Sequence, residues 1–598
     1  MTSGSESAPG EEAAVEPAAE ASAAARESQA GDVAASPPSS AGRTLARNSA
    51  VMASGTIVSR ITGVLRDVAM TAALGFFLVS DAFSLGNSLP TIVYILVIGG
   101  ALNAVFIPQL VRRMKEDADG GQAYADRLLT LVATLLLALS VVAVIAAPWI
   151  VDLYTPSDYP QNEFDLAVAF ARLCLPQIFF YGLYTMLSQV LNSRGRFGAP
   201  MFAPIANNIV AIATFGLFIV VAGTSAAADG VLTTDQVLIL GIGTTLGVMV
   251  QAVILLPVMW RSGYAWRPRF DWRGAGLGKA GSLAAWTVGL VLVNQAAYVF
   301  ITRLATQANV NASAADAVAA GLTTYQKAHL IFMLPHSVIT VSIVTAMLPA
   351  LSRTAHAGDL RQVGSDVART MRAVAVLIAP VTALLLVNGA AIAILLFGYG
   401  AATPQQAGLM GLIVSVFMLG LLPFTLFYVL LRGYYALEDT RTPFWITVGF
   451  SVLLLALAYP LFAIAPQAGG QQVAAIALAY SLSYWAGFLL AWWLLARRVG
   501  AMESARTAWV IVRTVLSAAI AVGVMVAALA VFRANQPSIE TVTWQVRGSL
   551  LLGVVLTSAI GLAVFLGAAW ALRIGEVSDV LSLVRRMGGR VRNRGEQA

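Results

Sequence analysis

Long apolar runs, separated by short polar stretches, fill most of this 598-residue sequence. A helix needs about 20 mostly apolar residues to cross the roughly 30 Å hydrocarbon core of a bilayer. Only 11% of the residues are charged, whereas soluble proteins have about 25%. The sequence therefore predicts an all-α polytopic membrane protein with about 14 transmembrane helices. The expected spans lie near residues 48–76, 81–111, 126–153, 164–192, 199–222, 236–259, 280–305, 319–350, 371–398, 406–436, 443–465, 472–496, 508–532 and 547–573.

Lysine and arginine gather in the loops on one side of these spans, as they do in cytoplasmic loops. The opposite loops contain only Arg533 and Arg547. Because the number of expected spans is even, both termini are predicted to be cytoplasmic, including the basic tail at 576–598. The net charge of +7 then reflects topology. The tail is expected to be a solvated end, and contact of its basic residues with anionic lipid headgroups is the alternative. Membrane lipids are expected partners of the protein as a whole, and no nucleic-acid partner is expected.

The first 45 residues are rich in Ala, Glu, Ser and Pro and contain no apolar run. Such a composition cannot build a core, so residues 1–45 are predicted to form a disordered cytoplasmic segment. They lack the basic start, short apolar stretch and cleavage site of a signal peptide, and the first span is expected to direct its own insertion. The single cysteine, Cys174, excludes an internal disulfide.

Two pairs of internal repeats indicate a duplicated architecture. The segments 175–200 and 422–443 share Leu-Pro, a later Tyr and a later Arg at an offset of 247 residues. The segments 89–113 and 334–353 both run from Leu-Pro to Pro-x-Leu-x-Arg at an offset of 245. A period of this length contains six expected spans, so the two copies have the same orientation in the membrane.

The repeats predict a division of the chain into two lobes of six helices, at residues 46–275 and 276–500. Two additional transmembrane helices are expected within 501–575. Duplicated bundles of this kind usually bind their substrate between the two halves and work by rocking. The sequence therefore favours a transporter.

The first span carries Arg60, Arg66 and Asp67. A charged side chain in hydrocarbon costs at least about 2.5 to 3.5 kcal/mol, so these groups are expected to face the protein interior or water. At 100° per residue, Arg60 and Asp67 share one stripe of the helix, and Ser59, Gly63 and Arg66 share another. Neither arginine is four residues from Asp67, so no favourable local ion pair is expected.

Further cations within expected spans are Arg172, Arg303, Lys327 and Arg432. His329 also lies in a span, and the acidic Asp81 begins the second span. An excess of cations predicts an anionic cargo. Guanidinium groups suit phosphate because they donate two parallel hydrogen bonds. An internal salt bridge is the alternative interpretation of the charges in the first span.

Several motifs resemble one known family. The segments ASGTIVSRITGVLRD, SDAFSLGNSLP, FIPQL and MLPALSR look like those of MurJ (MviN), the lipid II flippases of the MOP transporter superfamily, and the resemblance extends over about residues 46–575. It implies a 14-helix protein of the bacterial cytoplasmic membrane that moves undecaprenyl-diphosphate-linked disaccharide-pentapeptide outward for peptidoglycan synthesis. It also implies that Arg60, Arg66 and Asp81 are needed for function.

The sequence departs from the family pattern at four positions. Many members have two arginines where this chain has Tyr94 and Ile95, a glutamate at Gly99, and an arginine at Leu330. Lys327 is one helical turn before Leu330 and is a candidate to supply the missing charge. The alternative is that Lys327 extends to a membrane interface.

The resulting hypothesis is alternating access, in which Arg60 and Arg66, together with Lys327 or Arg303, bind the diphosphate. Asp81 is expected to pair with an arginine in one state only. The sequence leaves the coupling ion or membrane potential open and predicts no cofactor or metal site.

Two alternatives to this function remain open. Another MOP exporter of drugs or of a different polyprenyl-linked glycan is the closest. A drug exporter would favour acidic residues in its cavity. A non-transporting scaffold for cell-wall synthesis proteins is a second alternative. An enzyme is not expected, because His329, His336 and His356 form no HExxH motif.

Overall fold

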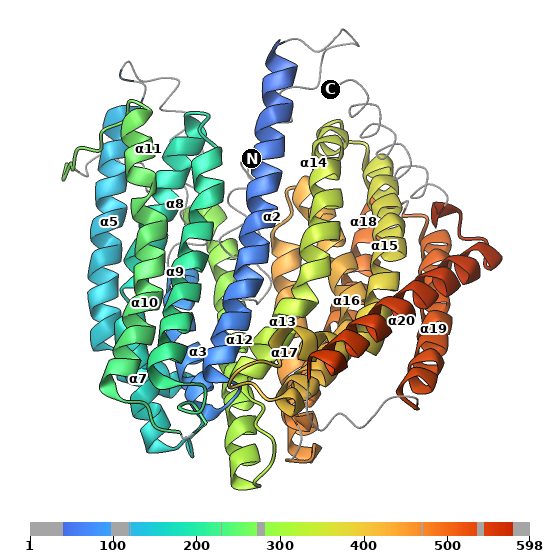
Figure 1. Ribbon diagram of the computed structural model, residues 1–598. Helices are drawn as coiled ribbons and strands as arrows, with labels where there is room; N and C mark the ends of the chain where they lie inside the picture. Colours follow the sequence, from blue (N-terminus) through green and yellow to red (C-terminus); the bar gives the residue numbers. More distant parts are fainter. Residues whose placement is uncertain are drawn as a thin grey trace. The chain divides into compact units, whose positions relative to one another are not determined.

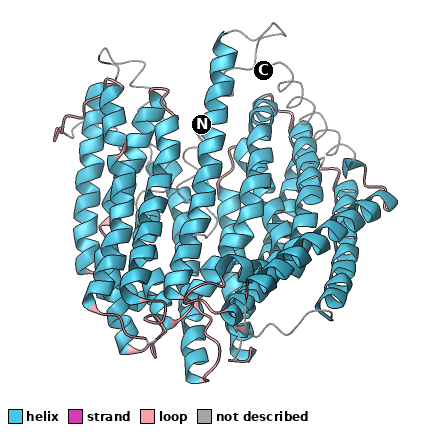
Figure 2. Cartoon of the chain, in the orientation of Figure 1, coloured by secondary structure: helices cyan, strands magenta, loops and turns pink. Residues whose placement is uncertain are grey.

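A computed structural model describes residues 40–96, 119, 121–228, 230–271, 281–467, 470–500, 502–534 and 543–577, without the side chains of 40–53, 281–285, 287 and 533–534. All regular secondary structure in these residues is helical (Figure 2). The predicted fold class is therefore confirmed. Twelve helical segments in the described part of the chain are long and apolar enough to cross a membrane. The first two predicted spans correspond to α2 (Ser40–Leu74) and α3 (Leu78–Tyr94), which are not among the twelve. The count of fourteen is consistent with this structure and stays a prediction.

Many large apolar side chains point away from the protein. Val220 and Trp570 are each 83% exposed, and Ile464 is 79% exposed. A soluble monomer rarely leaves such large apolar areas in water, whereas a bilayer accepts them. These faces are the ones expected to contact lipid.

The chain divides into two compact units, which are described separately. Unit 1 contains Met1–Lys327, Phe397–Gln406 and Phe462–Val473, and unit 2 contains the remaining residues. The lobes predicted from the repeats, 46–275 and 276–500, have a different boundary and stay a prediction.

Figure 1 labels most helices of unit 1. After α2 and α3 come α5 (Gln122–Ile145), α6 (Ala147–Tyr154), α7 (Gln161–Cys174), α8 (Gln177–Ser193), α9 (Gly198–Ala222), α10 (Thr234–Val253), α11 (Leu255–Arg261), α12 (Gly281–Ala314) and the start of α13 (Leu322–Pro335). The helix α2 begins inside the segment predicted to be disordered, and residues 1–39 of that segment lie outside the described residues. Residues 97–111 of the second predicted span also lie outside them.

Four predicted spans are interrupted in the structure, three of them next to a proline. The span predicted at 164–192 is two helices, because α7 ends before Leu175 and Pro176 and α8 begins after them. Pro148 stands at the start of α6, where α5 and α6 meet. A third break separates α10 from α11 at Ile254. A π-helical turn, η3 (His336–Thr340), follows Pro335 in the span predicted at 319–350. Proline lacks a backbone N–H and interrupts the hydrogen-bond ladder at such points.

The core of unit 1 joins α2, α3, α7, α9 and α10. Phe83 of α3 lies at its centre, edge to face with Phe170 at 5.1 Å and with Phe215 at 5.8 Å. The helices α2 and α9 approach closely because Gly55 has no side chain, and an added Cβ would lie 3.0 Å from Met201. Figure 1 shows α9 beside α10, and the two are in contact along their length. This packing places one face of α2 against α9.

Unit 2 contains the rest of α13, η3, α14 (Val341–His356), and most of α15 (Leu360–Phe397), α16 (Pro404–Ala436), α17 (Arg441–Ile464) and α18 (Gln471–Val499). Its core is aromatic. Phe332 contacts Phe417, Phe424 and Tyr480, with ring centroids 5.2 to 5.7 Å apart. His329 packs among these rings.

The last two helices, α19 (Ser504–Ala534) and α20 (Trp544–Ala571), pack against α15 within unit 2. Arg372 of α15 forms ion pairs with Glu503 at 3.2 Å and with Glu576 at 3.0 Å. Thr557 of α20 donates to Asn388 of α15 at 3.0 Å. The helices expected within 501–575 are thus present and are held to α15 by polar contacts as well as apolar ones.

Candidate functional site

All five residues predicted for the site belong to unit 1. Arg60 and Arg66 lie on α2, and Lys327 contacts α2 at Asp67. One stripe of α2 faces Asn208 of α9. The Asn208 amide donates to the Ser59 carbonyl at 3.2 Å and to the Thr62 hydroxyl at 3.0 Å. Its oxygen accepts a hydrogen bond from Arg66 at 3.3 Å. Gly63 lies opposite Asn208, with room for this contact. The stripe of Ser59, Gly63 and Arg66 predicted from helical spacing therefore packs on α9.

Asp67 faces a different neighbour. Its carboxylate forms an ion pair with the ammonium group of Lys327 in α13, and both side chains are at most 10% exposed. Arg66 contacts the other carboxylate oxygen at 3.4 Å and is 25% exposed. Two cations thus converge on one carboxylate, and these three groups together carry one excess positive charge. Such an arrangement suits an anionic ligand.

Sequence reasoning did not identify the partner of Asp67. It excluded an arginine four residues away, yet Arg66 reaches the carboxylate from the adjacent position and Lys327 reaches it from 260 residues later. The sequence does contain one signal for this pair. An acidic residue inside a span requires a cation, and Lys327 is one of the cations within the predicted spans.

Lys327 is buried and its ammonium contacts Asp67, so the interpretation that it extends to a membrane interface does not describe this structure. Its replacement of the charge absent at Leu330 stays a prediction. Arg60 lies two turns before Asp67 on α2, and its side chain is half-buried. The predicted role of Arg60 likewise stays a prediction.

Asp81 is buried at the start of α3 and binds the beginning of α13. It accepts hydrogen bonds from the backbone amides of Leu322 at 3.0 Å and Thr323 at 2.7 Å. The Asn309 amide of α12 donates to it at 2.8 Å. The first amides of a helix have no partner within the helix, and their positive dipole end favours an anion. In this structure Asp81 therefore caps α13 and joins it to α3 and α12.

The chain comes very close to Asp81 at Gly321, just before α13. An added Cβ at Gly321 would lie 2.1 Å from the carboxylate oxygen and 2.5 Å from the Cβ of Asn309. Only glycine fits this position without displacing the capping carboxylate. Ser80 and Ser84 of α3 hydrogen-bond to the Thr323 hydroxyl at 2.9 and 2.8 Å and strengthen the same junction.

Arg303 of α12 is positioned by a different element. Its guanidinium donates to the carbonyl of Leu153 in the last turn of α6 at 3.4 Å. A cation is favourable there because the C-terminal carbonyls of a helix carry partial negative charge. Arg303 is thus not among the groups that contact Asp67, whereas Lys327 and Arg66 are.

The remaining residues singled out from the sequence are placed as follows. Tyr94 is buried and its hydroxyl bonds to Thr185 at 2.7 Å. Arg172 is exposed on α7, and Arg432 stacks on the Tyr428 ring at 4.4 Å. Within the described ranges, no cluster of three or more His, Cys, Asp or Glu side chains could hold a metal ion.

Comparisons with known proteins agree with the motifs. A family model described as lipid II flippase MurJ matches residues 70–544. A protein of Rhizobium meliloti (strain 1021) named "Probable lipid II flippase MurJ" is 29% identical over 432 residues, which are 70% of this chain and 76% of that protein. A second relative with the same name, from Rhizobium tropici, is 28% identical over 466 residues, with 74% and 81% coverage.

Two solved structures share the fold. The first is titled lipid II flippase MurJ in an inward closed conformation. It has a TM-score of 0.65 and 18% identity and covers 87% of this chain and 97% of its own. The second is an inward-facing multidrug resistance MATE transporter of the MOP superfamily. Its TM-score is 0.57 at 14% identity, with 76% and 98% coverage. At these identities the likeness concerns the fold alone.

Proposed function

Because this chain belongs to the MurJ family of lipid II flippases, we propose that it moves lipid II from the cytoplasmic to the outer leaflet of the bacterial cytoplasmic membrane. The observation that carries the proposal is the family match over residues 70–544. The cargo is undecaprenyl diphosphate linked to a disaccharide-pentapeptide. The protein is a transporter, and it performs no chemical step on the lipid.

The proposed diphosphate site lies on α2. Arg60 and Arg66 bind the phosphate oxygens, since a guanidinium donates two parallel hydrogen bonds to such a group. The convergence of Arg66 and Lys327 on Asp67 supports this assignment. A diphosphate that approaches Arg66 competes with Asp67 for the two cations. Of the two further cations predicted for the site, Lys327 belongs to this cluster and Arg303 is engaged at α6.

The proposed mechanism is alternating access by rocking of the predicted lobes, 46–275 and 276–500. A ligand shifts such an equilibrium only through different affinities for the two states. Asp81 supports this proposal because it caps α13 in the state described here. Release of α13 would leave two amides and a buried carboxylate without partners, so the two states would differ in these hydrogen bonds. The predicted pairing of Asp81 with an arginine would belong to a second state.

The proposed orientation has both termini in the cytoplasm, since lysine and arginine gather in the loops on that side. The opposite side contains the loop around Ser157 and the end of α12 near Ser313. Contacts with other cell-wall synthesis proteins are also proposed, in addition to the lipid substrate.

Other MOP exporters are the main competing function, because a MATE transporter shares the fold. The cationic groups on α2 favour an anionic cargo over cationic drugs. A non-transporting scaffold is the other alternative. It requires no diphosphate site, so it predicts that substitutions of Arg60 and Arg66 leave cell growth unchanged.

The test is complementation of a bacterium depleted of its lipid II flippase, combined with a direct assay of lipid II exposed on the outer leaflet. We expect the chain to restore both growth and exposure. Restored growth without lipid II exposure would favour the scaffold. Failure of both, with the protein present in the membrane, would contradict the proposal.

A further inference from the structure

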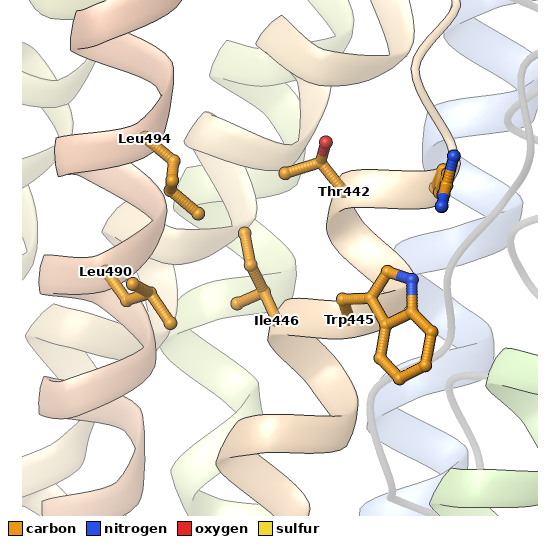
Figure 3. A pocket seen from close by; sticks show the side chains of 6 residues that line it. Thr442, Trp445, Ile446, Leu490 and Leu494 are labelled. Carbon is orange, nitrogen blue, oxygen red and sulfur yellow. The ribbon is translucent and has the colours of Figure 1, made fainter.

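A groove of 460 Å³ opens between α17 and α18 in unit 2. Its lining residues are Arg441, Thr442, Trp445, Ile446, Leu490 and Leu494. Figure 3 shows Ile446 of α17 between the two helices, facing the leucines of α18. Leu490 is 42% exposed and Trp445 is 56% exposed, whereas Ile446 is buried. The groove is thus open and mostly apolar, with a buried floor. Its lining also includes the cation of Arg441 and the hydroxyl of Thr442.

The polar end of the groove is basic. Arg441 is the first residue of α17, and Arg497 and Arg498 lie in the last turn of α18. Arg498 forms an ion pair with Asp439, just before α17, which brings the two helix ends together. Asp439 is engaged with Arg498, and neither it nor the exposed Glu438 is among the residues that line the groove. The lining itself therefore has positive charge only.

Tryptophans mark the level of this end relative to a bilayer. Trp445 lies one turn after Arg441, and Trp493 lies one turn before Arg497. The Arg497 guanidinium stacks on the Trp493 ring at 3.8 Å. Tryptophan is enriched at the level of the lipid headgroups. The arginines therefore lie at the height of lipid phosphates, and Leu490 lies at the height of acyl chains.

The other sequence repeat has the same arginine in a different environment. Arg194 stands at the position equivalent to Arg441, 247 residues earlier. There the chain that follows α11 folds back, and the buried Tyr264 packs its ring against Arg194 at 4.9 Å. Tyr264 is anchored by a hydrogen bond to Asp126 at 2.7 Å. In the first repeat the chain covers its own arginine, whereas Arg441 lines an open groove.

We propose that the groove between α17 and α18 binds an anionic phospholipid of the bilayer, with its phosphate at Arg441 and an acyl chain along Ile446, Leu490 and Leu494. Basic pockets between helices on the cytoplasmic side suit anionic headgroups. The apolar floor selects a lipid over a soluble anion, since inorganic phosphate gains nothing from Leu490 or Leu494. The site is independent of the diphosphate site proposed on α2, and the inference does not rest on the transported substrate.

The test uses the full-length chain purified in detergent. It is titrated with phosphatidylglycerol and, separately, with phosphatidylcholine that has the same acyl chains, and the first bound lipid is quantified by native mass spectrometry. We expect Arg441→Gln to weaken phosphatidylglycerol binding about fivefold, the factor for about 1 kcal/mol per arginine near an anionic headgroup. The matched control is Arg361→Gln, which removes an exposed arginine from α15 and should change nothing.

Two further variants test the apolar part of the site. Leu490→Trp fills the groove and should weaken binding of both lipids, whereas Leu489→Trp, on the neighbouring exposed face of α18, should not. Asp439→Asn removes a carboxylate from the basic end and should strengthen phosphatidylglycerol binding. The unfolding midpoint of each variant without added lipid verifies that it is folded.

Three outcomes would overturn the proposal. Equal affinity for phosphatidylglycerol and phosphatidylcholine would show that the headgroup charge does not contribute to binding. Equal effects of Arg441→Gln and Arg361→Gln would show that the lipid does not bind at the groove. Preferential binding of undecaprenyl diphosphate, with the same sensitivity to Arg441→Gln, would assign the groove to the transported lipid. Loss of flipping by the whole protein is a separate result, because lipid binding at the groove is measured without transport.

Discussion

The ammonium group of Lys327 lies against the carboxylate of Asp67, although 260 positions separate the two residues in the sequence. Both side chains are withdrawn from water, and Arg66 adds a second, longer contact to the same carboxylate. Removal of one partner from a buried ion pair costs about 3–5 kcal/mol, because the remaining charge is uncompensated. The pair therefore holds α2 and α13 together, and it also sets the charge next to Arg66 in the proposed diphosphate site.

The first prediction concerns this pair. We expect Asp67→Asn and Lys327→Met each to lower the free energy of unfolding in mixed micelles by about 3 kcal/mol. The double variant should lose clearly less than the sum, since it leaves no buried charge from the pair. The exposed pair of Arg127 and Asp271, 2.6 Å apart, is the control. Its removal should lower the free energy of unfolding far less, because water already screens both charges, and equal costs for both pairs would contradict the prediction.

The second prediction concerns the arginines of α2. Arg60→Ala and Arg66→Ala should each reduce lipid II exposure at least about tenfold, because a hydrogen bond to a charged group contributes about 1.5–3 kcal/mol. Arg66→Lys should keep part of the activity, since it retains the charge and loses the two-pronged donor. Arg172→Ala, at an exposed arginine of α7, is the control and should remain active. Normal flipping with both alanines present would refute the diphosphate site.

The third prediction tests the junction at Asp81. Gly321→Ala should destabilise the protein by about 1–3 kcal/mol, because the new Cβ would overlap the Asp81 carboxylate. Gly216→Ala in α9 is the control, since nothing lies within 4 Å of the Cβ that it adds. That control should be neutral or stabilising by up to about 1 kcal/mol, as expected for alanine in a helix. The midpoints of thermal unfolding of the two variants test this prediction. An unchanged midpoint for Gly321→Ala would exclude the tight junction.

The fourth prediction is a pH dependence at the loop before α17. Burial alone would raise the pKa of Asp439, but hydrogen bonds from Thr442 and the charge of Arg498 hold this pKa below its ordinary value of 3.8. A carboxylate with a lowered pKa stabilises the folded state above its unfolded pKa, and this contribution is lost as the pH falls through the folded value. The difference in unfolding midpoint between wild type and Asp439→Asn should therefore be constant from about pH 7 to pH 5 and shrink below about pH 4. A difference independent of pH would argue against the ionised pair.

The fifth prediction concerns orientation. Cysteines introduced at the exposed positions Ser157 and Ser313 should react with an impermeant maleimide added outside the cell, and one at Ala265 should not. The native Cys174 is buried and gives little background. The reverse labelling pattern would invert the proposed topology.

The sequence by itself determined the features that depend on neighbouring residues along the chain. Apolar length predicts a transmembrane helix wherever it occurs, so the helices of this all-α protein follow from local composition. Helical periodicity likewise placed Arg66 with Ser59 and Gly63, and this stripe meets Asn208 in the structure. The breaks at Pro148, Pro176 and Pro335 have a local cause as well, because proline cannot donate a backbone hydrogen bond.

Only the tertiary structure decided which distant groups meet. Asp67 meets Lys327, and Asp81 caps α13 where an arginine partner was expected. The equivalent arginines Arg194 and Arg441 have different surroundings, a buried tyrosine for one and an open groove for the other. The physical reason is that a charge inside a membrane protein must be compensated, but sequence spacing does not reveal which helix supplies the compensating group. That depends on which helices are neighbours, and neighbours are chosen by packing along whole helix faces.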